Sequence, residues 1–201
     1  MKNIKLPAPH FEDHMNIEEA LYGRRSIRKF LETPIEINEI SKILWAAMGK
    51  SQFRRTVPSA GAKYPLELYV LIGNVKGINT GFYYYDWLEH SLEFIDKEDL
   101  REKLCHASLN QDFILKAPID IIIAADFERT ITRYGERGTR YVYMEAGHVG
   151  QNIYLVCEAL NLGTVAVGAF RDEEVKEVLN IVLDPLYIMP IGHKDLNILN
   201  K

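Results

Sequence analysis

The apolar positions of the chain follow two spacings, one typical of helices and one typical of strands. Helical spacing predicts helices over residues 17–23, 39–47, 96–106, 138–162 and 173–179. Alternating or short apolar runs predict strands over residues 66–72, 81–85, 91–95, 119–125, 164–167 and 186–191. Helices are therefore interleaved with both paired and isolated strands.

Polar residues and glycines mark the expected ends of the helices. Asn16, Asn38 and Asp172 are expected as N-caps, because their side chains accept backbone N–H groups there. Asp96 is expected to open the third helix, and Gly163 is expected to end the longest one.

The order of these elements predicts an α+β fold in which helices cover a mostly antiparallel or mixed central sheet. Two of the strands are expected to form a hairpin around Asp86 and Trp87. Helices and strands do not alternate regularly enough for a doubly wound sheet. In the absence of repeats, linkers and low-complexity tracts, we expect an N-terminal arm (1–15) and a single domain (16–201).

The composition narrows the class of protein. Of the 201 residues, 47% are apolar and 26% are charged, which is typical of a globular chain. The net charge of −4 gives no overall field for nucleic acid, and the sequence shows neither a secretory signal nor an apolar run of membrane length. We therefore expect a cytoplasmic protein without nucleic-acid or membrane partners. Cys105 and Cys157 lie in helical patterns outside any CxxC motif and are expected as buried apolar fillers.

A basic cluster is the first candidate for chemistry. Arg24, Arg25, Ser26 and Arg28 follow Gly23 directly after the first predicted helix. Guanidinium groups make bidentate hydrogen bonds to phosphate oxygens, and the glycine lets the main chain bend around an anion. The cluster therefore predicts a phosphate site, with a solvated basic face as the alternative.

Two stretches of small residues suit a flat ring. Residues 58–61 read Pro-Ser-Ala-Gly before a predicted strand, and residues 167–169 read Val-Gly-Ala at the end of another. Small side chains let a planar ligand approach the main chain closely. The alternatives are a plain turn at the first stretch and a packed strand-to-helix turn at the second.

A polar stripe marks the longest predicted helix. Tyr141, Glu145, His148 and Asn152 are spaced by four, three and four residues and so share one face. An acid beside a histidine indicates acid–base or metal chemistry, whereas polar groups at a subunit interface are the simpler interpretation. No second cluster has the spacing of metal ligands, so no metal site is expected.

Several familiar signatures are missing from the sequence. It has no GxGxxG after a strand, no GxxxxGK[ST] loop and no GxSxG elbow. A separate dinucleotide-binding fold and a serine hydrolase are therefore not expected.

Four blocks together resemble the nitroreductase family, most closely its branch related to the dehydrogenases that oxidise azoline rings in peptides. The blocks are RRSIRKF at 24–30, PSAGAKYPLELYV at 58–70, YVYMEAGHVGQNIYLVCEALNLGTVAVGAF at 141–170 and IMPIGHK at 188–194. They occur in the family's order along nearly all of the chain after residue 16. This common order is far more specific than any single block.

The resemblance implies an α+β sandwich that is an obligate homodimer, with FMN at the subunit interface. The phosphate and ribityl chain are assigned to the basic cluster and the end of the chain, and the ring to the small-residue segments. Residues 58–61 reach the ring from the other subunit, and an amide at 110 or 111 contacts the ring or the ribityl chain. The implied cofactor-binding residues are Arg24, Arg25, Ser26, Arg28, Pro58, Ser59, Ala60, Gly61, Asn110, Gln111, Val167, Gly168, Ala169, His193 and Lys194.

The function implied is that of an FMN-dependent oxidoreductase. In such enzymes NADH or NADPH binds transiently, transfers a hydride to the flavin and leaves before a small acceptor, such as a nitro compound or a quinone, enters. Two alternatives stay open. One is a flavin dehydrogenase that oxidises an azoline-type C–N bond, with Tyr141 as the candidate base, and the other is a flavin-binding protein without catalysis.

Two departures from the family patterns bear on the substrate. Residues 60–65 read Ala-Gly-Ala-Lys-Tyr-Pro where many nitroreductases have a Ser-x-x-Asn-x-Gln-Pro loop. Arg140-Tyr141 is the nearest counterpart of the Lys-Tyr pair of the azoline dehydrogenases, and an arginine stays protonated at any ordinary pH. The acceptor, the choice between NADH and NADPH, and a role of residues 129–137 as a lid are not decided by the sequence.

Overall fold

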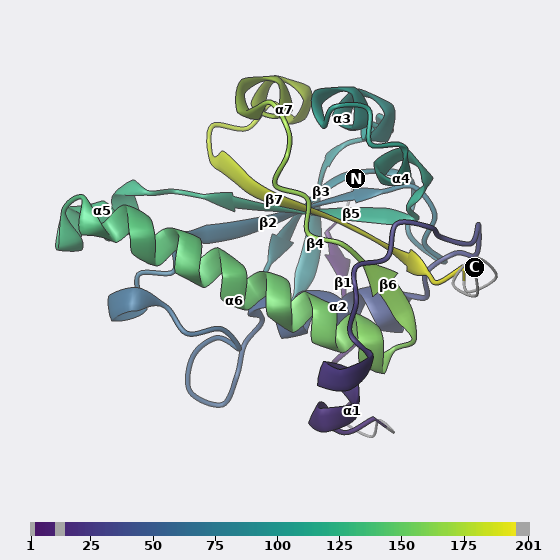
Figure 1. The fold of residues 1–201 in the computed structure, drawn as a ribbon, viewed down its shortest axis with the longest axis horizontal. Helices are drawn as coiled ribbons and strands as arrows, with labels where there is room; N and C mark the ends of the chain where they lie inside the picture. The colour runs from purple at the N-terminus through teal and green to yellow at the C-terminus, as the bar shows by residue number, and fades with distance from the viewer. Residues whose placement is uncertain (1–2, 11–14, 196–201) are drawn as a thin grey trace.

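The structure is a computed structural model that describes residues 3–10 and 15–195. A seven-stranded sheet runs through the centre of the molecule (Figure 1). The strands follow the order β1-β4-β3-β2-β5-β7-β6, and every neighbouring pair is antiparallel. The strands are β1 Ile4–Lys5, β2 Leu66–Ile72, β3 Gly81–Asp86, β4 Ser91–Asp96, β5 Ile119–Ala125, β6 Leu162–Thr164 and β7 Asp184–His193. The predicted α+β class with a mostly antiparallel sheet is confirmed.

Helices cover both faces of this sheet. Figure 1 shows α2 and α6 below the sheet, α3, α4 and α7 above it, and α1 beside the C-terminal end of α6. The helices are α1 Ile17–Gly23, α2 Ile37–Met48, the 3₁₀ helix η1 Ala60–Ala62, α3 Arg101–Ala107, α4 Asp112–Lys116, α5 Glu128–Tyr134, α6 Arg137–Ala159 and α7 Asp172–Leu179. Each face has its own hydrophobic core.

The central strand β5 explains why the sheet needs both covers. All seven of its residues are buried, and side chains of a strand point alternately to opposite faces. Ile121 and Ile123 therefore belong to the core on the α6 side, whereas Ile122 belongs to the core on the α7 side. Six of the seven residues are apolar, as expected for a strand covered on both faces, and the exception is the buried Asp120.

The long helix α6 spans the lower face. Its 23 residues correspond to roughly 35 Å at the rise of an α-helix. Val142, Ala146, Val149 and Ile153 are buried at spacings of four, three and four, which turns this stripe toward the sheet. Other faces of α6 remain available for the site described below.

Two of the expected N-caps are wrong. The helix α2 begins at Ile37, and the Glu39 carboxylate accepts the backbone N–H of Glu36 at 2.8 Å, so Asn38 lies inside the first turn. Asp172 is already the first residue of α7 rather than its cap. Acidic residues are favourable inside the first turn as well as at the cap, because the N-terminal end of a helix is positive. They therefore leave the exact first residue of a helix ambiguous in the sequence. Asn16, in contrast, caps α1 as predicted.

The third helix starts later than predicted. Asp96 is the last residue of β4, where it pairs with Phe82, and α3 begins only at Arg101. The Asp96 side chain accepts the backbone N–H of Glu98 at 2.8 Å, which is the local hydrogen bonding of a turn. Pairing in the sheet thus overrides the helical pattern at this point.

The end of the longest helix and the strand after it also differ from expectation. The helix α6 ends at Ala159, and Gly163 lies within β6, which ends at Thr164. Val167 forms only an isolated bridge with Ile188 instead of belonging to a strand over 164–167. The four elements β1, η1, α4 and α5 were not predicted. The first three are too short to show a periodic pattern, and α5 has only Ile131 and Tyr134 as apolar positions. Among the described residues, none of the helices has the length and apolar character needed to cross a bilayer.

Candidate functional site

The basic segment runs along the outer edge of β6. Ser26 forms a parallel bridge with Thr164, and the Ile27 N–H donates to the Thr164 carbonyl at 2.9 Å. A Cβ on Gly163 would lie 2.7 Å from the Ile27 side chain, so the close approach requires glycine there. The segment then reaches the end of β7, where Phe30 bridges Lys194. The basic segment and residues 193–194, which were expected to share one site, are therefore adjacent.

The three guanidiniums of this segment form no ion pair with a carboxylate of the described residues. The Arg24 guanidinium lies over the ring of Tyr154, 5.1 Å from its centre. The Arg28 guanidinium lies 6.0 Å from the ring centre of Phe113 in α4, and Arg25 is exposed. Positive charges without counter-ions attract an anion, and a phosphate has the geometry that guanidinium groups bind well.

Tyr154 also belongs to this site, although the sequence analysis did not predict it. Its hydroxyl lies 2.9 Å from Ser26 Oγ and accepts the Ala166 N–H at 2.8 Å. It thereby ties the basic segment to the strand end that leads to residues 167–169. A tyrosine at apolar spacing within a predicted helix signals only packing, so no sequence motif points to this role.

The amide at 111 connects the small-residue segment to the rest of the site. Gln111 Nε2 donates to the carbonyl oxygens of Ser108 and Ala169, both at 2.9 Å. Asn110 is exposed in the preceding turn, with a positive φ of 58°. Of the two candidate amides, Gln111 is thus the one that contacts residues 167–169.

His193 and Lys194 are already engaged within the chain. Lys194 Nζ lies 2.7 Å from a carboxylate oxygen of Glu158, and their side chains are only 8% and 14% exposed. His193 Nε2 lies 3.3 Å from the Pro34 carbonyl oxygen and 3.9 Å from a carboxylate oxygen of Glu39, beside α2. Lys194 therefore stands near the predicted phosphate site as half of a buried ion pair, and His193 faces α2.

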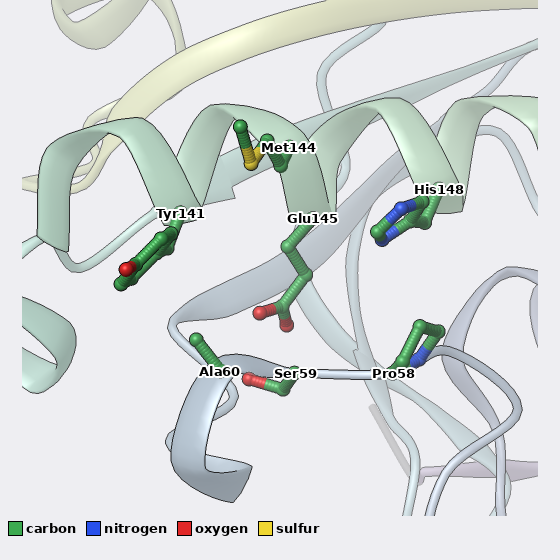
Figure 2. A pocket seen from close by; sticks show the side chains of 7 residues that line it. All are labelled: Pro58, Ser59, Ala60, Tyr141, Met144, Glu145 and His148. Atoms are coloured by element: carbon green, nitrogen blue, oxygen red, sulfur yellow. The ribbon is translucent and has the colours of Figure 1, made fainter.

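A pocket of about 270 Å³ lies at the other end of the candidate site (Figure 2). It is lined by Pro58, Ser59, Ala60, Tyr141, Met144, Glu145 and His148. Figure 2 shows the three loop residues facing α6, with the Glu145 carboxyl group pointing across the gap toward Ser59. The next residue, Gly61, has a φ of 57°, and a Cβ there would lie 2.6 Å from the Tyr134 hydroxyl. The turn at 58–61 therefore requires glycine at position 61.

Three residues of the polar stripe of α6 line this pocket, and the fourth contacts α2. Tyr141, Glu145 and His148 line the pocket, whereas Asn152 Nδ2 donates to the Ala46 carbonyl of α2 at 3.0 Å. The Tyr141 ring packs edge-on against Tyr134, and its hydroxyl accepts a hydrogen bond from Arg137 Nε at 3.3 Å. No three potential ligands among the described residues are grouped as a metal site would require.

Glu145 has the most unusual environment of the pocket. Its side chain is 3% exposed, and its Oε1 atom has no hydrogen-bond partner among the described residues. Burial raises the pKa of Glu145 to about 7, although a hydrogen bond with Ser59 and the positive charge of Arg55 both lower it. The group is therefore poised to gain or lose a proton near neutral pH.

The two parts of the candidate site lie apart in one chain. The basic segment contacts Tyr154, whereas the pocket is built around Glu145, nine residues earlier on α6. Nine residues correspond to about 14 Å along a helix axis. Figure 1 agrees, because α1 and η1 lie near opposite ends of α6. A single chain does not bring the two groups of predicted residues together.

Comparison with known proteins identifies close relatives. A model of the Nitroreductase family matches residues 21–193. The chain is 47% identical over 193 residues to "Putative nitroreductase MJ1384" of Methanocaldococcus jannaschii, over 95% of this chain and 97% of that protein. The crystal structure of a Ralstonia eutropha protein with the same description superposes with a TM-score of 0.84 at 28% identity, covering 96% of this chain and 90% of that one.

A second group of relatives includes processing proteins of microcin B17 and trifolitoxin. The chain is 26% identical over 165 residues to the microcin B17-processing protein McbC of Escherichia coli, over 78% of this chain and 60% of McbC. A chain of the E. coli microcin synthetase McbBCD complex superposes with a TM-score of 0.73 at 25% identity, covering 94% of this chain and 77% of that one. The predicted likeness to this branch is confirmed. Because the family model covers most of the sequence and the archaeal relative nearly all of it, the chain belongs to the nitroreductase family.

Proposed function

We propose that the protein is an FMN-dependent oxidoreductase that passes electrons from NADH or NADPH to a small acceptor such as a quinone or a nitro compound. The observation that carries this proposal is that Arg24, Arg25 and Arg28, which flank Ser26 in the sequence, form no ion pair with a carboxylate of the described residues. Such a donor set fits the FMN phosphate, which is a dianion with three acceptor oxygens. Arg24, Arg28 and Ser26 would hold it.

The rest of the cofactor would lie against backbone and amide groups. Gln111 fixes the Ala169 carbonyl, and Gly168 leaves the main chain open, since a Cβ there would come no closer than 3.6 Å to Tyr187. These groups would orient the ring and exclude water from one side of it. The flavin, when bound, accepts a hydride from the nicotinamide and passes it to the acceptor. The protein needs no nucleophile for this chemistry.

The proposal includes a homodimer in which each flavin site uses both subunits. The phosphate residues and the pocket at 58–60 are separated along α6, so residues from two copies would complete each site. The exposed side of α6 fits this arrangement, because Tyr143 and Met144 are 56% and 53% exposed and Gly147 has open space around it. Large apolar side chains exposed together are typical of an interaction surface.

A second candidate function is the oxidation of an azoline-type C–N bond in a peptide. The likeness to McbC favours it, and Tyr141 lines the pocket where a base would be needed. Its neighbour Arg140 offers no lysine amine in that place, which favours the first candidate.

The experiment that tests the proposal is an anaerobic absorption titration of the protein after incubation with FMN. Binding followed by bleaching of the flavin bands with NADH or NADPH supports the oxidoreductase and identifies the donor. Bound flavin that neither donor bleaches would favour the dehydrogenase or a carrier of flavin. Absence of FMN binding would refute the proposal. Analytical ultracentrifugation of the same sample tests the dimer.

A further inference from the structure

Glu145 stands out among the pocket residues because it is buried and incompletely hydrogen-bonded. Its side chain is 3% exposed and points from α6 toward the loop at 58–60 (Figure 2). Within the described part of the chain, Oε1 lacks any hydrogen-bond partner. Buried polar atoms are nearly always paired, so an unpaired one at the wall of a pocket marks a place where a ligand completes the pairing.

The other polar groups of the pocket are less suited to exchange a proton with a bound molecule. His148 is exposed to solvent, and the Tyr141 hydroxyl already accepts a hydrogen bond from Arg137. Ser59 Oγ accepts the Tyr64 backbone N–H at 2.8 Å, which holds it within its own loop. Glu145 is thus the buried acid with an oxygen free for the pocket.

We propose that Glu145 donates a proton to the acceptor that binds between α6 and residues 58–60. This inference rests on the proposed flavin reaction and names a residue that takes part in it. Reduction of a quinone to a hydroquinone takes up two electrons and two protons. The hydride from the reduced flavin carries both electrons and one proton, and the Glu145 O–H supplies the second proton to a quinone oxygen. The resulting carboxylate regains its proton from water at the open side of the pocket.

The charges around Glu145 permit this role near neutral pH. Burial raises its pKa to about 7, against the opposing influence of the Ser59 hydrogen bond and of Arg55. Arg55 is held in place between the rings of Tyr64 and Trp87, at 4.7 and 4.1 Å. Tyr141 and His148 flank Glu145 on α6, and Arg133 and Tyr134 of α5 lie against Gly61 on the loop side. The acid form is therefore present below about pH 7 and declines above it.

The test compares the FMN-loaded wild type with Glu145→Gln, which keeps the shape but has no acidic proton. Glu102→Gln, an exposed position of α3 on the opposite face of the sheet, is the matched control. Anaerobic stopped-flow absorption measures flavin reduction by the nicotinamide and flavin reoxidation by a small quinone separately. We expect Glu145→Gln to slow reoxidation by roughly 100-fold or more and to change reduction by less than about 3-fold.

The pH dependence gives a readout that a purely structural role would not produce. Wild-type and Glu102→Gln reoxidation should decline as the pH rises through about 7, and Glu145→Gln reoxidation should not follow this decline. A readout without turnover is the infrared difference spectrum of wild type minus Glu145→Gln. It should contain the band of a protonated carboxyl group that disappears over the same pH range.

The outcomes separate this inference from the proposed function. A wild type that does not bind FMN would refute both. Wild type that binds and cycles normally, with Glu145→Gln reoxidised as fast and with the same pH profile, would overturn the inference alone. Equal slowing of both half-reactions together with weaker FMN binding would show that Glu145 only holds the loop, and would overturn it too.

Discussion

Replacing Arg24 with alanine removes one of the guanidiniums assigned to the phosphate. The guanidinium lies 5.1 Å from the ring centre of Tyr154, next to the Ser26 hydroxyl that also contacts this tyrosine. A charge-assisted hydrogen bond is worth about 1–3 kcal/mol. Its loss should raise the dissociation constant of FMN by roughly 5- to 150-fold, since 1.4 kcal/mol corresponds to a factor of ten.

The substitution has two effects, because Arg24 both stacks on Tyr154 and is assigned to the phosphate. Loss of this contact lowers the free energy of unfolding by about 0.5–1 kcal/mol, but it does not depend on the phosphate. Riboflavin has the same ring without the phosphate, so its affinity for Arg24→Ala should change by less than about 2-fold. Arg24→Lys keeps the positive charge and loses the planar fork, and it should fall between wild type and alanine.

Fluorescence quenching of FMN and of riboflavin on binding measures both affinities in the same buffer. Raising the salt concentration should weaken FMN binding to the wild type more than to Arg24→Ala, because exposed charges are screened. An equal loss of affinity for FMN and riboflavin would refute the assignment of Arg24 to the phosphate. So would an unchanged affinity for FMN.

Three further predictions concern stability and pH. Lys194→Met should lower the free energy of unfolding by about 3–5 kcal/mol in urea denaturation, because it leaves the Glu158 carboxylate buried without its partner. Gly61→Ala should lower it by more than about 1 kcal/mol in the same assay, since φ is 57° and the Cβ would lie 2.6 Å from the Tyr134 hydroxyl. Glu145 has a pKa raised from 4.5 to about 7, so the folded state binds more protons than the unfolded chain between these values. Its contribution to stability should therefore fall by about 3 kcal/mol as the pH rises from 4.5 to 7, and Glu145→Gln should lack this part of the slope.

Each of these predictions has a result that contradicts it. For the ion pair, the double variant Lys194→Met with Glu158→Gln should recover much of the lost stability, and no recovery would argue against an uncompensated charge as the cause. For Gly61, a thermal unfolding midpoint equal to that of the wild type would show that the loop adapts freely. For Glu145, identical slopes of stability against pH in the wild type and in Glu145→Gln would exclude a raised pKa.

Much of the sheet was predictable because its strands depend on local patterns. The strand β5 was predicted with its observed bounds, since a short run of Ile and Ala broken only by Asp120 fits a strand buried on both faces. The hairpin of β3 and β4 was predicted from the turn at Asp86. The starts of α2, α3 and α7 were not, because several acidic residues offered alternative caps and pairing with Phe82 held Asp96 in a strand.

The candidate site was predictable only as separate segments. The basic segment and the loop at 58–61 carried recognisable residues, and the structure shows that each is built as a distinct part. The contact of Tyr154 with Ser26 joins residues 128 positions apart, and the hydrophobic periodicity of the sequence does not predict contacts at such a separation. The same holds for Glu145, whose environment depends on the burial that the fold creates around it. The sequence placed it on a polar stripe without distinguishing it from Asn152.

The position of the basic segment along β6 has a consequence for aggregation. The strand β6 ends the sheet, and an uncovered end strand offers free backbone groups to which a strand of another molecule can pair. Ser26 and Ile27 occupy these groups at Thr164, and Phe30 continues the cover at Lys194. The segment that carries the arginines therefore also covers the end strand and prevents another molecule from pairing with it. A variant that detaches this segment should lose its anion site and become prone to self-association in a single step.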